Sequence, residues 1–105
     1  MQHIVTFASQ GNNIIVNPSS LNVRAGDTVV FVAADANHYD VIIPNRDNFF
    51  VNNDNGKTLE FVVTQSQSVT TPAVNNKPNG TNKYYSVTTP GGGVPYAPPR
   101  IIIIT

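Results

Sequence analysis

Apolar residues in this chain occur in short runs, and within several runs they alternate with polar residues. The clearest alternation places Leu21, Val23 and Ala25 between polar neighbours. Such runs, rich in β-branched and aromatic residues and separated by Gly, Pro, Asn and Ser, are typical of β-strands. Helical spacing is almost absent. The pattern predicts strands at residues 3–7, 13–16, 21–25, 28–32, 39–43, 58–63, 68–71, 81–87 and 100–105, as in an antiparallel sandwich or barrel.

The segments between these runs carry turn signals. Residues 45–55 are polar and turn-rich, with room for one short helical turn. Asn55-Gly56 and Asn79-Gly80 are predicted to form type I′ turns, in which both central residues take positive φ. The four isoleucines at 101–104 predict a strand that is buried on both sides, or one whose outer face meets another surface.

The length of 105 residues predicts one domain covering residues 1–105. A domain of this size buries about 65% of the surface that its unfolded chain exposes. That burial is enough for a core that needs neither metal nor disulfides. The chain shows no internal repeat and no linker.

Charge is scarce: 11% of the residues are charged and the formal net charge is zero, whereas an ordinary domain has about 25% charged residues. We therefore expect no nucleic-acid partner, and the longest apolar run is far too short for membrane insertion. The absence of cysteine excludes disulfides, thiolate catalysis and iron–sulfur clusters. A neutral polar surface is typical of secreted bacterial modules, so we expect a secreted, periplasmic or cell-surface location.

Several segments, in order, carry a family resemblance. Residues 21–32 (LNVRAGDTVVFV) place a strand that ends in Gly-Asp before a strand that carries Val and Phe. Residues 37–44 (NHYDVIIP) resemble the segment with the first copper histidine of cupredoxins. Residues 83–86 (KYYS), the next loop and the strand at 100–105 resemble the cysteine strand, ligand loop and closing strand of plastocyanin-like proteins. The resemblance covers nearly the whole chain and implies an all-β, two-sheet Greek-key β-sandwich of cupredoxin type.

The resemblance also implies a type 1 copper site, made by two histidines, a cysteine thiolate and a weak axial methionine. Here Ser86 stands at the cysteine position and Thr89 at the second histidine position. The loop at 90–99 contains no methionine. We therefore expect a copper-free protein without a cofactor, in which these hydroxyls and Tyr39 fill the former cavity and bond to one another or to adjoining loops.

The first ligand position can be read in two registers. In one, His38 survives as a ligand and Asp40 is buried beside it, which is costly unless the carboxylate is paired. In the other, Tyr39 takes the ligand position, with Val41 and Ile43 also inward and His38 outward. Strand alternation favours the second register.

Metal binding by an unconventional ligand set around His38 or His3 is the alternative function, in electron transfer or copper handling. Met1-Gln2-His3 has the form of an amino-terminal copper motif, which needs a free amine and a terminus not tied into a sheet. In a cupredoxin layout His3 and His38 lie at opposite ends and cannot share one ion. We expect His3 to be a surface histidine at the start of a strand.

An enzyme is not expected. Asp35, His38 and Asp40 are neighbours in sequence, but a general base also needs a nucleophile and a substrate pocket. Solvated loop charges explain this cluster equally well.

A candidate recognition loop carries Pro95, Tyr96 and Pro98. Proline stiffens such a loop and tyrosine offers broad contact area, which suits a protein or glycan partner. The equal alternative is that Tyr96 packs down as a lid on the emptied copper cavity. The function expected from the sequence is thus a non-enzymatic binding or structural module. Self-association is expected if the strand at 101–104 has an exposed face.

Overall fold

The structure, a computed structural model, describes residues 1–51 and 56–105. Regular structure in these residues is entirely β-strand, which confirms the predicted class. The strands are β1 (Gln2–Gln10), β2 (Asn13–Asn17), β3 (Ser20–Val23), β4 (Thr28–Ala33), β5 (Tyr39–Ile43), β6 (Leu59–Val63), β7 (Val69–Thr70), β8 (Asn82–Tyr84), β9 (Ser86–Thr88), β10 (Val94–Pro95) and β11 (Arg100–Ile103).

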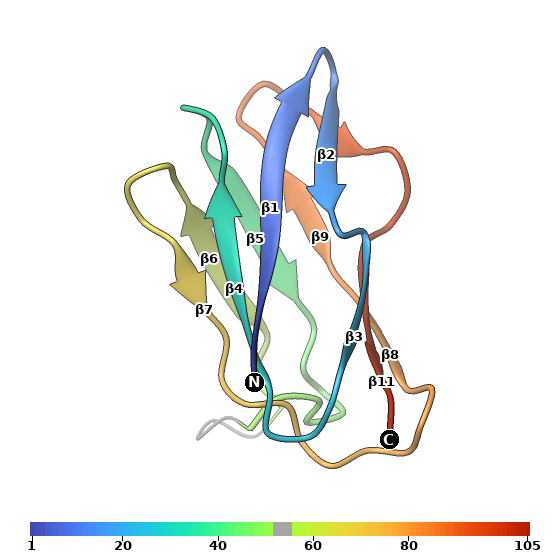
Figure 1. Cartoon of the computed structure of the whole chain (residues 1–105). Coiled ribbons are helices and arrows are strands. Elements are labelled where there is room, and N and C mark those ends of the chain that lie inside the picture. Colours follow the sequence, from blue (N-terminus) through green and yellow to red (C-terminus); the bar gives the residue numbers. More distant parts are fainter. Residues whose placement is uncertain (52–55) are drawn as a thin grey trace.

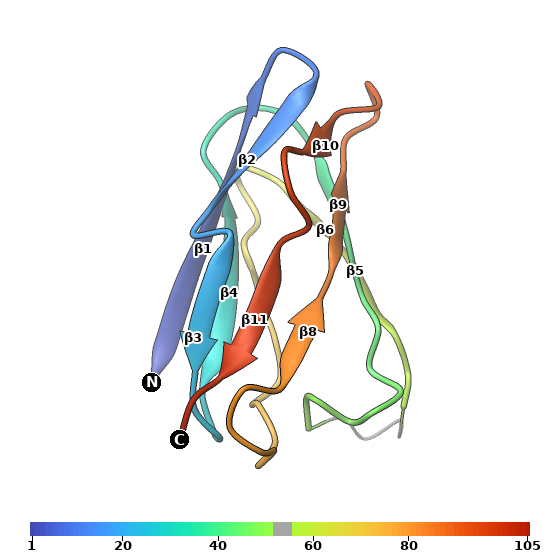
Figure 2. The same ribbon diagram turned by 90° about the vertical axis from the view of Figure 1, so that its right-hand side faces the viewer.

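The strands form two facing layers. One layer is a five-stranded sheet with the order β10-β2-β1-β4-β7, and the other is β6-β5-β9 (Figures 1 and 2). The third sheet, β3-β11-β8, closes one side of the sandwich (Figure 2). In it β3 continues the line of β2 from one layer, β8 continues the line of β9 from the other, and β11 pairs with both. Both termini lie at the same end of the sandwich (Figure 1).

The core follows from strand alternation. In β4 and β5 every second side chain points inward and is buried, as the sequence pattern predicts. The centre is aromatic: Phe7 stacks on Phe31 with ring centroids 5.5 Å apart and also packs against Tyr39 at 5.4 Å. Such pairs each contribute about 0.5–1.5 kcal/mol beyond the area they bury.

Strand pairing differs from the antiparallel prediction. Among the described residues three pairs are parallel, namely β1 with β4, β10 with β2, and β11 with β3. Parallel neighbours need a connection that crosses over rather than a tight hairpin. The chain makes these crossovers by passing between the sheets, as it does from β2 to β3 and on to β4 (Figure 1). Alternation within a strand carries no information about the direction of its neighbour.

Several local predictions need correction. Residues 45–51 contain a turn and no helix, and Asn55 lies outside the described residues. In the Asn79-Gly80 turn only Gly80 has positive φ (87°), and Thr81 N donates to Pro78 O over 3.1 Å. Positive φ at the third residue alone fits a type II turn rather than type I′. The predicted strand at 81–87 is interrupted at Tyr85, and β10 forms in a segment predicted as loop.

The run of isoleucines at 101–104 is buried on one side and partly exposed on the other. Ile101 and Ile103 are fully buried, whereas Ile102 and Ile104 are half-buried. This strand therefore presents only a partial outer face.

Candidate functional site

The candidate site lies at the Tyr39 end, defined here as the end of the sandwich where β1 and β4 finish and β5 starts (top of Figure 1). The residues that the sequence marked as copper-site positions lie at or near this end. The loop at 89–99 joins them there.

Tyr39 is fully buried and its hydroxyl is held on two sides. The hydroxyl donates to Asp35 Oδ1 over 2.8 Å and lies 2.9 Å from Ser9 Oγ. Asp35 also accepts from the backbone amides of Ser9 (2.8 Å) and Asn37 (3.2 Å). The network thus joins the end of β1, the loop after β4 and the start of β5.

This network shifts the acidity of both its ionisable groups. Burial raises the pKa of Asp35, but the hydrogen bonds from Ser9, Tyr39 and Asn37 outweigh burial and hold its pKa below the usual range. Burial raises the pKa of Tyr39, and its bond to the Asp35 carboxylate raises it further. At neutral pH the pair is therefore a carboxylate and a neutral phenol, which is a stable structural arrangement.

His38 points away from this network. It is exposed, while Tyr39, Val41 and Ile43 are buried, so the structure adopts the register that alternation favours. The hollow beside His38 is lined by Ala36, by His38 itself and by Thr64–Ser66, which offer no further imidazole or carboxylate. Asp35 bonds to Tyr39 rather than to His38, so no acid–histidine pair forms there.

Ser86 does not fill the former cavity, and this expectation was wrong. Ser86 is exposed, whereas Tyr85 and Val87 on either side of it are buried. The inward residue of β9 is Val87, which lies opposite Val41 of β5. The alternation runs unbroken through Tyr85, with odd-numbered residues inward and even-numbered residues outward from 81 to 88. The inward position of Ser86 was implied by the family resemblance and not by this residue pattern.

Thr89 bonds within its own loop rather than to Tyr39 or Ser86. Its Oγ1 accepts from Gly93 N over 3.1 Å, and its carbonyl accepts from Gly92 N over 2.9 Å. A Cβ on Gly93 would lie 3.0 Å from Thr89 Oγ1, so glycine permits this close approach. The hydroxyl that was expected in the cavity is instead used to close the loop.

These residues do not fit a copper ion. A type 1 centre needs a thiolate and two imidazoles that converge on one ion. The chain has no cysteine, and its two histidines lie at opposite ends of the sandwich, His3 near the amino terminus and His38 at the Tyr39 end. The described residues contain no group of three His, Cys, Asp or Glu side chains that could hold a metal ion.

The second metal candidate is tied into the fold. His3 Nε2 lies 2.7 Å from Asp27 Oδ2, and the amino group of Met1 donates to Asp27 Oδ1 over 3.1 Å. Asp27 also accepts from Arg24 N, and Thr28 N donates to Met1 O. The bond from His3 is the main reason why the pKa of Asp27 lies far below its usual range. The amino-terminal copper motif needs a terminus free of such contacts, and this one is not free.

The candidate recognition loop is exposed. Tyr96 has 69% of its surface accessible, so it is not a lid over the cavity. Val94 and Pro95 form β10, which pairs with β2 and fixes the start of the loop. Tyr96 borders a small hollow with Ile14, Ile15 and Ser19, and Pro98 borders a second hollow against β9.

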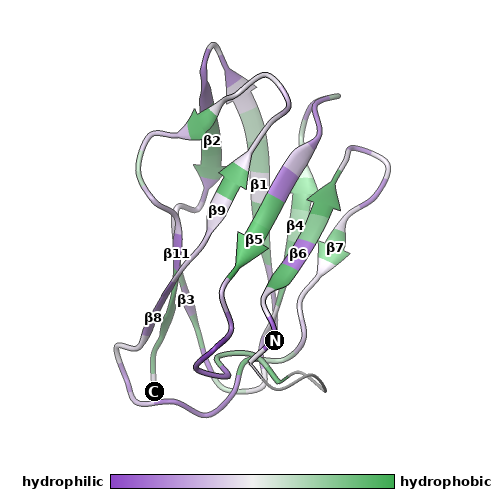
Figure 3. Ribbon diagram, turned by 180° about the vertical axis from the view of Figure 1, so that it is seen from behind, coloured by the Kyte–Doolittle hydropathy of each residue, from purple (hydrophilic) through white to green (hydrophobic). Residues whose placement is uncertain are grey.

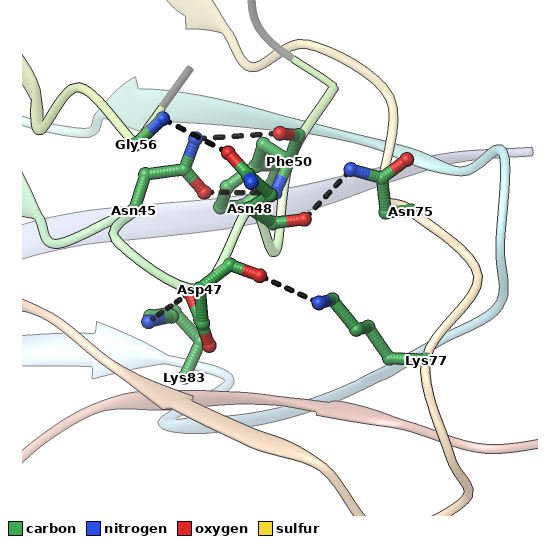
Figure 4. Close-up of polar contacts among 8 residues, drawn as sticks. All are labelled: Asn45, Asp47, Asn48, Phe50, Gly56, Asn75, Lys77 and Lys83. Atoms are coloured by element: carbon green, nitrogen blue, oxygen red, sulfur yellow. Dashed lines mark hydrogen bonds and ion pairs between the residues drawn. The ribbon is translucent and has the colours of Figure 1, made fainter.

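The opposite end of the sandwich is a closed polar network (Figure 4). Buried Asn45 accepts from Phe50 N over 2.9 Å and donates to Phe50 O over 3.3 Å. Lys83 Nζ bonds to Asp47 Oδ1 at 2.8 Å. Burial raises the pKa of Asp47, but Lys83 and the backbone amides of Asp47 and Phe49 together outweigh burial and hold that pKa below its usual range. These groups satisfy one another, which favours a structural role.

Comparison with known proteins supports the fold. No protein-family model and no curated protein matches the sequence. Among solved structures, the reduced Cu(I) form of a proline-to-glycine mutant of amicyanin at pH 4 has a TM-score of 0.62 and 14% identity, covering 97% of this chain and 81% of that one. A methionine-to-alanine mutant of amicyanin with Cu(I) has a TM-score of 0.61, 16% identity and the same coverages. The chain therefore has the cupredoxin fold, in a divergent form that lacks the cysteine ligand.

Two residues at these sites were missed in the sequence. Asp35 was treated as a solvated loop charge, yet it anchors Tyr39. Asp27 enters the sequence analysis only as the end of a Gly-Asp motif, yet its carboxylate binds His3. Asp27 and His3 lie 24 residues apart, so no local spacing could reveal their contact. Asp35 and Tyr39 are only four residues apart, which was a weak signal of their contact.

Proposed function

We propose that this protein is a non-enzymatic, copper-free binding module, a single cupredoxin-like domain that acts outside the cytoplasm, in the periplasm or at the cell surface. Its partner surface is the loop that carries Pro95, Tyr96 and Pro98. The partner is a protein or a glycan.

One observation supports the copper-free part above all. The inward residue at the start of β5 is Tyr39, whose hydroxyl is already bonded to Asp35 and Ser9. A neutral phenol with raised pKa is a poor ligand for copper, which prefers thiolate and imidazole. This hydrogen-bond network supports the absence of a metal at the Tyr39 end.

The binding part is supported by the exposure of Tyr96 on a pre-ordered loop. Pro95 lies in a strand, and buried Pro99 anchors the far end of the loop. A loop held in this way loses little entropy when a partner orders it, and tyrosine is common among residues that dominate binding. The low charge of the chain supports export, as its composition resembles that of secreted modules.

The alternative function is metal binding around His38 or His3. A Cu(II) titration of protein purified without a histidine tag distinguishes it from this proposal. We expect no tight one-to-one binding and no difference between the wild type and His38→Ala. Tight binding that His38→Ala or His3→Ala abolishes would establish the alternative.

The loop is tested by screening the wild type against arrayed glycans and arrayed peptides. A ligand retained by the wild type should be lost with Tyr96→Ala and kept with Tyr84→Ala, which removes an exposed tyrosine from β8. Equal binding by the wild type and Tyr96→Ala would place the binding surface elsewhere.

A further inference from the structure

Among the residues that the structure describes, the outward side chains of the five-stranded sheet include no charged one. We call it the charge-free face and define it by the even-numbered residues 2–10 of β1, the odd-numbered residues 13–17 of β2, the even-numbered residues 28–32 of β4, and Thr70 and Val94. These positions hold only Gln, Asn, Thr, Ala, Ile and Val. The sheet is seen from its outer side in Figure 1.

The other faces of the sandwich are different. Asp40 and Glu60 lie on the outer face of β5 and β6, where hydrophilic bands cross both strands (Figure 3). Arg100 lies on β11, where its Nε donates to Ser20 Oγ over 3.0 Å. The absence of charge is therefore a property of one face of the described structure and not of every face.

Exposed apolar side chains accompany the lack of charge. Ile4 is 60% exposed, Ile15 is 38% exposed and Val94 is 51% exposed, and all three belong to the charge-free face. Ile4 lies on β1, the central strand of the sheet, and Ile15 lies on the neighbouring strand β2. Ile15 lies opposite Ala8 and Val94 opposite Asn13, so these two are near each other, whereas Ile4 lies further along β1. Exposed apolar residues also occur on the outer face of β5 and β6, at Ile42 and Val62, so the lack of charge is what distinguishes this face.

We propose that the charge-free face binds the same face of a second copy of this chain. A two-fold dimer brings a surface against itself, so any charge near the axis would meet a like charge. This face avoids that repulsion and buries no ion. Its Asn, Gln and Thr side chains can both donate and accept hydrogen bonds, so they can pair with their own copies.

The size of the face sets the strength of the dimer. β1, β2 and β4 have nine, five and six residues, whereas the edge strands β7 and β10 have two residues each. With a rise of about 3.3 Å per residue and strands about 4.8 Å apart, the plan area is roughly 350–400 Å². This is below the roughly 800 Å² per partner of a standard interface. The dimer should therefore be weak and populated at protein concentrations of about 0.1–1 mM.

The test is sedimentation velocity of the full chain over a concentration series from about 10 µM to about 1 mM. We expect the weight-average sedimentation coefficient of the wild type to rise with concentration. Ile4→Lys and Ile15→Lys each place like charges within the dimer and should weaken association by about tenfold or more. Ile42→Lys is the matched control, because Ile42 is 42% exposed but lies on β5 in the other layer. Urea midpoints close to that of the wild type confirm that each variant is folded.

A wild type that stays monomeric at the highest concentration would overturn the proposal. So would equal weakening by Ile4→Lys and Ile42→Lys, which would indicate a general charge effect. Retention of a monomeric wild type on a neutral polysaccharide, lost with Ile4→Lys, would assign the face to a glycan instead. Tyr96 borders the same hollow as Ile15, so Ile4→Lys is the variant that separates this test from the Tyr96→Ala test. Ile4 does not line that hollow, and the two tests can therefore fail independently.

Discussion

Replacing Tyr39 by phenylalanine removes one oxygen atom from the interior and leaves the ring in place. The lost hydroxyl donates to Asp35 at 2.8 Å and lies 2.9 Å from Ser9 Oγ, and the side chain is fully buried. A hydrogen bond to a charged group contributes about 1.5–3 kcal/mol to stability. The aromatic contact between Tyr39 and Phe7 should survive, because phenylalanine has the same ring. We therefore expect Tyr39→Phe to lower the free energy of unfolding by about 1.5–3 kcal/mol.

The assay is urea unfolding followed by far-ultraviolet circular dichroism. The midpoint should fall while the slope of unfolding free energy against urea stays the same, because the fold and its buried surface are unchanged. Tyr96→Phe is the matched control. Its side chain is 69% exposed, so losing that hydroxyl should change stability by less than about 0.5 kcal/mol.

Asp35 supplies the decisive comparison. If the Tyr39 hydroxyl stabilises the fold through Asp35, then Tyr39→Phe and Asp35→Ala should be non-additive by about 0.5–3 kcal/mol. The pKa of Asp35 is lowered in the fold, so its stabilisation is present above the unfolded pKa near 3.8 and is lost as pH falls below it. The difference in free energy of unfolding between the wild type and Tyr39→Phe should therefore become smaller as the pH falls below about 3.8. The reasoning would be refuted if the losses in unfolding free energy of Tyr39→Phe and Asp35→Ala simply added in the double variant, and if the difference between wild type and Tyr39→Phe did not change with pH.

Three further predictions follow from particular contacts. Asp27→Asn should lower the free energy of unfolding at neutral pH by about 1–3 kcal/mol. Because the pKa of Asp27 lies far below its usual range in the fold, this deficit should begin to narrow as the pH falls below 3.8 and should narrow further in stronger acid, as urea midpoints at several pH values can test. Gly80→Ala should cost about 1–2 kcal/mol in the same assay because φ is +87°, whereas Gly91→Ala, without positive φ, should be nearly neutral. Ser86→Cys should react with a thiol reagent in the native protein, and Val87→Cys only after unfolding, because Ser86 is exposed and Val87 is buried.

The sequence predicted the fold class well because alternation reports burial directly. Residues 28–32 and 39–43 were predicted as strands, and the structure gives β4 and β5 there with inward and outward side chains in the expected register. Alternation also holds across the interruption at Tyr85, where Tyr85 and Val87 are buried and Ser86 and Thr88 are exposed. Ser86 was misplaced because the family resemblance put it at the cysteine position, whereas the alternation of apolar and polar residues at 85–88 puts it outside.

The candidate site was predicted in its position but not in its bonds. Tyr39 was expected to point inward and does, but its partners are Asp35 and Ser9 rather than Ser86 and Thr89. Ser9 lies 30 residues from Tyr39 and reaches it only because β1 and β4 pair in parallel. The pairing direction is a tertiary property, so contacts that depend on it could not be found from local spacing.

Under the proposed copper-free function, the Tyr39 network supplies the order at this end of the cupredoxin fold. A metal ion would crosslink the loops it binds, and here a carboxylate performs that crosslink by accepting bonds from the start of β5, the end of β1 and the loop after β4. Each of these three hydrogen bonds is accepted by a charged carboxylate, so each is stronger than a bond between neutral groups, and none requires a metal ion. The loop at 89–99 is held separately, by the bonds of Thr89 to Gly92 and Gly93 and by the pairing of β10 with β2. Tyr96 can then face the solvent, which is the condition that a recognition role requires.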